Sequence, residues 1–223
     1  MKISELSNTS LRFITSGLML IVLGAVVALE IYFPQIHAVR WLSVFVVIGA
    51  MFETLKCFKN SDAETFNKHS IYFILFFAWL ILMLVSAYFV GAKPWIMLWL
   101  LMIIVGADVG GWLFGRIFGG DKLWERISGH KTWSGQIGGI ICGTVMSLLF
   151  CIATKSYAND IVFATLMGIS MSLLSQYGDL TASFIKRSLN IKDFGTLLPG
   201  HGGILDRFDG WIYILPLMWF FIG

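Results

Sequence analysis

The stretch "SIYFILFFAWLILMLVSAYFV", residues 70–90, carries no charged side chain over 21 residues. A helix needs about 20 largely apolar residues to cross the hydrocarbon core of a bilayer, so this stretch is long enough to span it. The whole chain has the same character: 57% of its 223 residues are hydrophobic and 13% are charged. Soluble domains carry roughly 25% charged residues. The sequence therefore predicts an integral membrane protein.

Six further apolar stretches accompany this one, at 13–33, 40–57, 94–117, 136–154, 160–182 and 209–222. None shows the alternating pattern of a membrane β-barrel, and unsatisfied backbone in lipid leaves the helix as the expected form. The first stretch has no convincing small-residue cleavage site, so we expect a retained helix rather than a signal peptide. The predicted fold is all-α, a polytopic helical membrane bundle of about seven transmembrane helices.

Basic residues predict the orientation of these helices. When the loops are counted alternately, all of the 16 lysines and arginines except Arg40, Lys93 and Lys155 fall on one side. Loops rich in lysine and arginine stay on the cytoplasmic side. We therefore expect a multi-pass protein of the cell (inner, cytoplasmic) membrane with a cytoplasmic N-terminus. The formal net charge of +3 then reflects topology, and we expect no nucleic-acid partner.

A carboxylate interrupts the sixth apolar stretch. An ionisable group such as Asp179 costs about 2.5–3.5 kcal/mol near the bilayer centre, so a functional role is the first hypothesis. Ser175, Ser183 and Lys186 are spaced so that they share one stripe of a helix with Asp179. The alternative is a polar contact, for example between Asp179 and Lys186, that only holds helices together.

The second polar feature is "KDFGTLLPGHGGILDRFDG", residues 192–210, directly before the last apolar stretch. Its glycines let the backbone approach a ligand closely, and exposed amides at such a turn suit phosphate oxygens. Asp206 and Asp209 are spaced i, i+3, which we expect to place both on the first turn of the last helix. A bound nucleoside triphosphate needs its charge neutralised by a divalent metal, and Asp179 and Asp206 are the best candidate ligands.

Basic side chains surround this glycine-rich stretch. Lys186, Arg187, Lys192 and Arg207 supply donors for phosphate oxygens, and His201 fits phosphate binding better than general-base catalysis. The alternative is an N-cap aspartate, a flexible glycine turn and juxtamembrane basic residues that only set topology. That alternative leaves the histidine and the density of carboxylates unexplained.

A third patch lies at 106–135, where Asp108 is a second carboxylate inside a span. Lys131 and Arg116 in this patch either meet lipid phosphate or simply follow the positive-inside bias. Glycines recur there at four-residue spacing, which predicts a small-residue packing face. They are Gly106, Gly110, Gly111, Gly115, Gly119, Gly135, Gly139 and Gly143.

Three features outside these patches receive structural interpretations. Glu30 and Glu53 lie in the first and second spans, where helix-end contacts are expected rather than catalysis. The segment 58–69 mixes both signs of charge and is expected to be a solvated connector. The three cysteines show no metal-ligand spacing and are expected to pack between helices.

The stretch "SFIKRSLNIKDFGTLLPGHGGILDRFD", residues 183–209, resembles the signature of the phosphatidate cytidylyltransferases, also called CDP-diacylglycerol synthases. The elements "GDL" at 178–180 and "KTW" at 131–133 also resemble that family. "LRFITSG" at 11–17 and the position of Glu53 resemble it more loosely. Two positions depart from its pattern: Ser134 stands where an acidic residue is common, and Gly129 stands near a common proline.

The resemblance implies transfer of a cytidylyl group from CTP to phosphatidate (phosphatidic acid) within the lipid bilayer. It implies Mg²⁺ or another divalent cation, with Asp179 and Asp206 as its ligands, and leaves room for a second metal ion and a homodimer. The residues expected to act in catalysis are Asp179, Asp206, Lys186 and Asp209. Those expected to bind substrate are Lys131, Arg187, Lys192, His201, Gly202, Gly203, Arg207 and Asp108.

This interpretation divides the chain in two. Residues 1–93 are expected to form scaffold helices on the lipid side, and 94–223 a catalytic region with cytoplasmic loops at 118–135 and 183–208. Three alternatives stay open. The first is a sister activity, either cytidylyl transfer to an isoprenoid or ether-lipid phosphate or a CTP-dependent lipid kinase. The second is an ion-coupled transporter that uses Asp108 and Asp179 as a relay. The third is an inactive scaffold protein.

Overall fold

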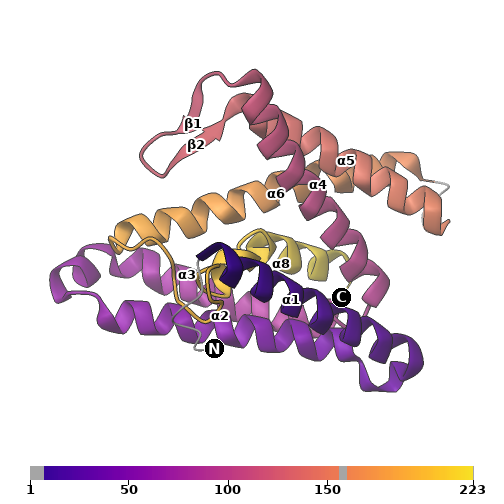
Figure 1. Cartoon of the computed structure of the whole chain (residues 1–223), viewed down its shortest axis with the longest axis horizontal. Coiled ribbons are helices and arrows are strands. Elements are labelled where there is room, and N and C mark those ends of the chain that lie inside the picture. The colour runs from indigo at the N-terminus through magenta and orange to yellow at the C-terminus, as the bar shows by residue number, and fades with distance from the viewer. Residues whose placement is uncertain (1–7, 156–159, 223) are drawn as a thin grey trace. The chain divides into compact units, whose positions relative to one another are not determined.

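The computed structural model describes residues 8–155 and 160–222 (Figure 1). Eight α-helices, one 3-10 turn and a two-stranded hairpin make up this part of the chain. The long helices are α1 (Asn8–Tyr32), α2 (Ala38–Asn60), α3 (Ala63–Val90), α4 (Pro94–Phe118), α5 (Trp133–Thr154) and α6 (Ile161–Ser188). The shorter elements are η2 (Pro34–Ile36), β1 (Lys122–Trp124), β2 (Ser128–Thr132), α7 (Leu205–Phe208) and α8 (Trp211–Ile222).

The prediction of a polytopic helical membrane protein is confirmed. Six helices, α1 to α6, are long and apolar enough to cross a membrane. The seventh predicted span is shorter than expected, because α8 has 12 residues. Many large apolar side chains on these helices are exposed, among them Leu20, Ile21 and Ile74. Such side chains suit contact with lipid tails rather than water.

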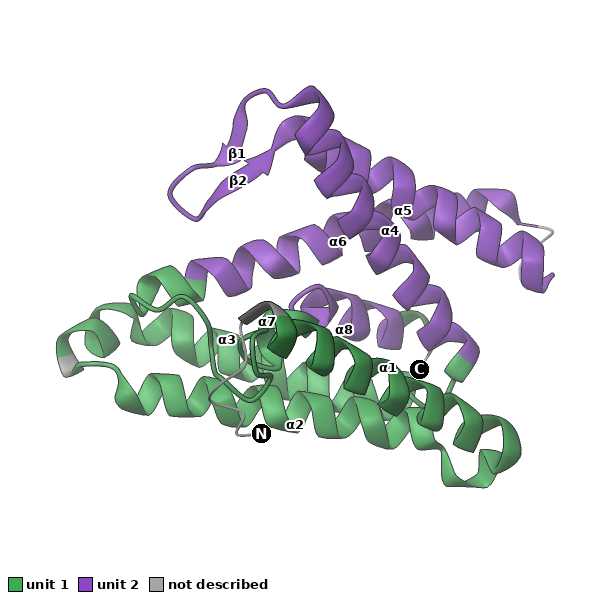
Figure 2. Cartoon of the chain, viewed as in Figure 1, with its two compact units in different colours: residues 1–94, 185–208, 221–223 green, residues 95–184, 209–220 purple. Residues whose placement is uncertain are grey.

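The chain divides into two compact units (Figure 2). Unit 1 comprises residues 1–94, 185–208 and 221–223, and unit 2 comprises residues 95–184 and 209–220. The polar segment after α6 thus belongs to the same unit as α1, α2 and α3.

In unit 1, α2 and α3 pack side by side as a helical hairpin (Figure 1). The expected solvated connector at 58–69 is almost absent, since only Ser61 and Asp62 separate the two helices. The reason is a cap: the Asp62 carboxylate accepts a hydrogen bond from the Thr65 amide at 3.1 Å, which starts α3 at once.

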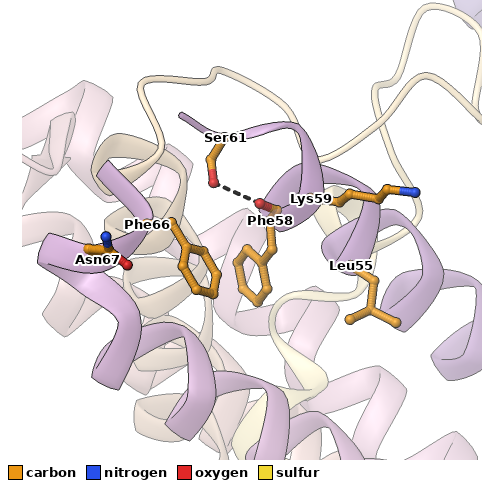
Figure 3. Close-up of a pocket in the computed structure, with 6 residues that line it drawn as sticks. All are labelled: Leu55, Phe58, Lys59, Ser61, Phe66 and Asn67. Atoms are coloured by element: carbon orange, nitrogen blue, oxygen red, sulfur yellow. Dashed lines mark hydrogen bonds between the residues drawn. The ribbon is translucent and has the colours of Figure 1, made fainter. Parts of the chain in front are cut away.

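An open hollow of about 460 Å³ lies at this connection, lined by Leu55, Phe58, Lys59, Ser61, Phe66 and Asn67 (Figure 3). Its lining is largely apolar, and the rings of Phe58 and Phe66 both face it. The Ser61 hydroxyl donates to the Phe58 carbonyl at 2.7 Å and so closes the end of α2. None of the predicted site residues lines this hollow.

In unit 2, glycines bring α4 and α5 together. A Cβ atom added to Gly110 would lie 2.6 Å from the Gly138 carbonyl oxygen, and one added to Gly106 would lie 2.7 Å from the Met146 side chain. A Cβ at Gly139 would lie 2.8 Å from the Ala107 carbonyl oxygen. The small-residue packing face is therefore confirmed at these positions, because any larger residue would separate the helices.

The loop between α4 and α5 contains the β1–β2 hairpin, which is antiparallel with Lys122 opposite Thr132. The Thr132 hydroxyl then caps α5 by accepting a hydrogen bond from the Gly135 amide at 3.2 Å. We expected a loop for this segment, and its mixed composition gave no sign of the hairpin.

The C-terminal region also differs from expectation. Because α6 continues to Ser188, the segment before α7 spans only residues 189–204, which we call the polar loop. Asp206 lies in the four-residue α7 and Asp209 in the turn after it, instead of sharing the first turn of the last helix. The break falls at Gly210, where a Cβ would lie 2.7 Å from the Ser175 hydroxyl oxygen. Close packing therefore requires glycine there, and glycine is a poor helix former.

We expect Gly110→Ala to destabilise the protein, because its methyl group overlaps the α5 backbone. Overpacking of this kind typically costs about 1–3 kcal/mol, and it should lower the thermal unfolding midpoint in detergent. The matched control is Gly24→Ala in α1, where an added Cβ meets nothing within 4 Å. An unchanged midpoint for Gly110→Ala would contradict the packing described for α4 and α5.

Candidate functional site

Asp206 is the most heavily bonded carboxylate of unit 1. Its Oδ1 accepts from the Lys186 ammonium at 2.8 Å, and its Oδ2 accepts from the amides of Phe194 at 2.8 Å and Gly203 at 2.9 Å. The side chains of the ion pair are only 5% exposed for Asp206 and 12% for Lys186. One carboxylate therefore joins the end of α6 to two points of the polar loop, at Phe194 and at Gly203.

The glycine turn, residues 199–203, is closed by a hydrogen bond from the Leu198 amide to the Gly202 carbonyl at 3.0 Å. Gly200 and Gly202 have φ angles of +76° and +90°, in the left-handed region that favours glycine. The predicted need for glycine at 202 is therefore a backbone requirement. Gly203 has a different reason: an added Cβ would lie 2.6 Å from Glu53 Oε2 and 2.8 Å from the Gly195 amide nitrogen.

Helix α1 holds the outer side of this turn. The Thr15 hydroxyl donates to the Pro199 carbonyl at 2.8 Å, and Arg12 Nε donates to the Gly200 carbonyl at 3.0 Å. The Arg207 guanidinium donates twice to the His201 carbonyl, at 3.0 and 2.7 Å. Three successive carbonyls thus have donors of their own.

The remaining predicted cations and His201 are disposed differently. Lys192 is exposed, and Arg187 is exposed with one long contact of 3.4 Å to the Ile191 carbonyl. His201 Nε2 lies 3.3 Å from the Ser16 hydroxyl, while its buried Nδ1 has no hydrogen-bond partner among the described residues. The two exposed cations are the ones free to meet phosphate, whereas Arg207 is already committed to the backbone.

Glu53 also reaches the polar loop. Its Oε2 accepts a hydrogen bond from the Ile204 amide at 2.6 Å, and the residue is only 4% exposed. We expected a helix-end contact for this residue, yet it lies within α2 and binds a segment far along the chain. Sequence reasoning also gave no role to Arg12, Thr15 or Ser16; the one available signal was the loose family likeness of "LRFITSG".

Unit 2 contains the second carboxylate–lysine pair. Lys131, carried by β2, lies 2.6 Å from Asp179 Oδ2 on α6, and its ammonium also donates to the Gln176 carbonyl at 3.3 Å. The Ser183 hydroxyl donates to Asp179 Oδ1 at 3.4 Å. Asp108 of α4 lies within electrostatic range of both charges. The hairpin therefore places the Lys131 ammonium beside the Asp179 carboxylate.

Asp209, also in unit 2, is placed by backbone packing. Its Oδ1 accepts from the adjacent Gly210 amide at 2.8 Å, and its carbonyl accepts from the Ile212 amide at 3.2 Å at the start of α8. Gly178 of α6 packs against it so closely that a Cβ there would lie 2.3 Å from the Asp209 carbonyl oxygen. This is the arrangement of a helix-start residue.

The described residues contain no group of three or more His, Cys, Asp or Glu side chains that could hold a metal ion. Asp206 offers about four lone-pair positions, of which three already accept hydrogen bonds. This donor set fits Mg²⁺ only where substrate supplies further ligands, which is the usual mode for Mg²⁺ bound with phosphates. Metal binding by Asp179 and Asp206 stays a prediction, as do the second metal ion and the homodimer.

Fold and geometry together define a class: a multi-span helical membrane protein with two lysine–carboxylate pairs and a glycine turn held by donors. The model of the cytidylyltransferase family matches residues 1–223. The chain belongs to that family.

Individual relatives carry a more specific name. The chain is similar to the phosphatidate cytidylyltransferases of Staphylococcus haemolyticus (41% identity over 121 residues), Staphylococcus epidermidis (43% over 117) and Staphylococcus aureus (42% over 123). These alignments cover 52–54% of this chain and 45–46% of each relative. The chain thus spans about half the length of the curated relatives it matches.

The two ion pairs should contribute unequally to stability. Breaking a buried pair by removing one partner costs about 3–5 kcal/mol, whereas an exposed pair is worth about 0–1 kcal/mol. The Lys186–Asp206 side chains are 12% and 5% exposed, and those of Lys131–Asp179 are 25% and 39% exposed. We therefore expect Lys186→Met to lower the thermal unfolding midpoint in detergent more than Lys131→Met does. The reverse order would contradict the assigned burial.

Proposed function

We propose that this protein transfers a cytidylyl group from CTP to phosphatidate, giving CDP-diacylglycerol and pyrophosphate for phospholipid biosynthesis. The observation that carries the proposal is the Lys186–Asp206 pair with its glycine turn, within a chain of the cytidylyltransferase family. The name of the staphylococcal relatives supports the choice of phosphatidate as acceptor.

The reaction requires no protein nucleophile. An oxygen of the lipid phosphate attacks the α-phosphorus of CTP, a new P–O bond forms, and the bond to the β-phosphate breaks to release pyrophosphate. The protein's contribution is positioning and charge neutralisation. Lys192 and Arg187, both exposed, suit the triphosphate, since its charges need mobile cations, and Arg187 has only one long contact, of 3.4 Å to the Ile191 carbonyl.

Lys186 has a different part from these exposed cations. Its ammonium is fixed between Asp206 and the ring of Phe194, whose centroid lies 5.7 Å away. A cation held in this way provides a fixed positive charge beside the polar loop, and fixed charges stabilise developing negative charge without reorganisation. Asp206 therefore both orders the loop and holds Lys186 in place.

A divalent cation, when bound, would neutralise the triphosphate and polarise its phosphorus. Asp206 would hold it through its remaining acceptor position, and Asp179 is the second ligand that the family resemblance implies. We place the polar loop on the cytoplasmic face of the cell membrane, where a soluble nucleotide meets a lipid headgroup. The bias of lysines and arginines supports this orientation.

Pyrophosphate release by the purified full chain in detergent tests the proposed reaction. With CTP, Mg²⁺ and a short-chain phosphatidate we expect release that ATP does not replace. Asp206→Asn should abolish it, because the amide side chain cannot accept from all three of its present donors. The matched control is Asp62→Asn, since asparagine caps α3 equally well. Release from the Asp206→Asn variant at the wild-type rate would remove Asp206 from the machinery.

Metal binding should depend on nucleotide, because the protein supplies too few ligands alone. With Mn²⁺ as an electron paramagnetic resonance probe, we expect little bound metal in the free protein and one or more bound ions after CTP is added. Asp206→Asn should lose the CTP-dependent signal. Tight Mn²⁺ binding without nucleotide would contradict coordination supplied mainly by substrate.

A further inference from the structure

Glu53 is a buried carboxylate that the proposed reaction does not use. It lies within α2, in a segment apolar enough to span a membrane, and is 4% exposed. An ionisable side chain in such a place is costly and is generally retained for a reason. The side chain is directed at the polar loop, which follows in the chain more than a hundred residues later.

Three residues of the polar loop converge on this one carboxylate. The Ile204 amide donates to Oε2 at 2.6 Å. A Cβ on Gly195 would lie 2.1 Å from Oε1, and a Cβ on Gly203 would lie 2.6 Å from Oε2. The carboxylate therefore lies between Gly195, in the middle of the loop, and Gly203 and Ile204 at its end. A side chain at 195 or 203 would have to displace it.

The closest obstacle to a side chain at 195 is Glu53. The three nearest atoms to the added Cβ all belong to the Glu53 side chain. The φ angle of Gly195 lies outside the left-handed region, so the backbone itself would accept alanine there. This distinguishes Gly195 from Gly202, whose φ of +90° favours glycine in any surroundings.

Glu53 and Asp206 bind neighbouring amides of the same backbone. The Gly203 amide donates to Asp206, and the next amide, that of Ile204, donates to Glu53. On the opposite side of the loop, the Phe194 amide donates to Asp206, and the next residue, Gly195, packs on Glu53. Any shift of the loop away from Glu53 must therefore move the two amides that orient Asp206.

We propose that Glu53 is a positioning residue for cytidylyl transfer. Its side chain packs against Gly195 and Gly203 and binds the Ile204 amide, and in this way it keeps the polar loop in the conformation that orients Asp206 and Lys186. This proposal rests on the proposed function. Glu53 acts through its volume and one accepted hydrogen bond, because its Oε1 has no hydrogen-bond partner among the described residues. Glutamine reproduces the volume and the acceptor, alanine reproduces neither, and aspartate is too short to reach Ile204.

The test is a set of full-chain variants in detergent: Glu53→Gln, Glu53→Asp, Glu53→Ala, Gly195→Ala, and Gly195→Ala combined with each of the last two Glu53 changes. Turnover is expressed per folded molecule, with kcat and the KM for CTP measured separately. Displacement of a catalytic group by about 1 Å can cost a hundredfold in rate. We expect a kcat loss of that order for Glu53→Ala and Gly195→Ala, a smaller one for Glu53→Asp, and turnover close to wild type for Glu53→Gln.

The double variants separate positioning from general damage. The closest contacts of an alanine side chain at 195 are all with Glu53, so adding Gly195→Ala to Glu53→Ala should cost far less than it does in wild type. Combined with the milder Glu53→Asp, Gly195→Ala should reduce kcat by a smaller factor than it does in wild type. This second comparison tests the proposal even if Glu53→Ala does not fold. Losses that simply multiply would overturn the proposal, as would a wild-type kcat for Glu53→Ala or an inactive Glu53→Gln.

Hydrogen exchange of the polar loop, followed by mass spectrometry, supplies a readout without substrate. We expect faster exchange over residues 193–204 in Glu53→Ala and wild-type exchange in Glu53→Gln. If wild-type protein shows no cytidylyl transfer yet exchange responds in this way, the proposed function is wrong, while the positioning of the polar loop by Glu53 is supported. Unchanged exchange in Glu53→Ala overturns that positioning whatever the activity.

Discussion

The structure of the polar loop depends on one carboxylate that accepts three hydrogen bonds. A glycine-rich segment has little preference for any one conformation, and ordering it costs free energy that its own few side chains cannot offset. Asp206 supplies the missing constraint by binding the Phe194 and Gly203 amides and the Lys186 ammonium together. Charge-assisted hydrogen bonds of this kind are among the stronger ones in proteins. Helix α1 and Arg207 bind the carbonyls of the glycine turn, and Glu53 lies between Gly195 and the Gly203–Ile204 end of the polar loop.

Much of the fold follows from composition and spacing. The apolar stretch at 70–90 lies within α3, and the predicted glycine face between α4 and α5 forms as expected. Both are local consequences: an apolar stretch must be helical in lipid, and small residues at four-residue spacing share one face of a helix. The connector at 58–69 was mispredicted because one cap, Asp62, outweighs the charge pattern of the segment.

The sequence names candidate site residues, but it does not show which residues pair with them. Spacing along α6 put Asp179 and Lys186 on one stripe, yet Asp179 pairs with Lys131 and Lys186 pairs with Asp206. Helical periodicity describes one helix and carries no information about which segment returns to meet it. Glu53 shows the same limit, because nothing near it in sequence reports that Gly195 and Gly203 will close around it.

Cytidylyl transfer requires that the α-phosphate of the nucleotide goes to the lipid. The most direct measurement gives the purified chain phosphatidate and CTP labelled with ³²P at either the α- or the γ-position, and then counts label in the extracted lipid. The account predicts lipid label from α-labelled CTP alone, with γ-label recovered as pyrophosphate. Lipid label from γ-labelled CTP would instead show a lipid kinase, and no lipid label from either nucleotide with folded protein would contradict cytidylyl transfer to phosphatidate.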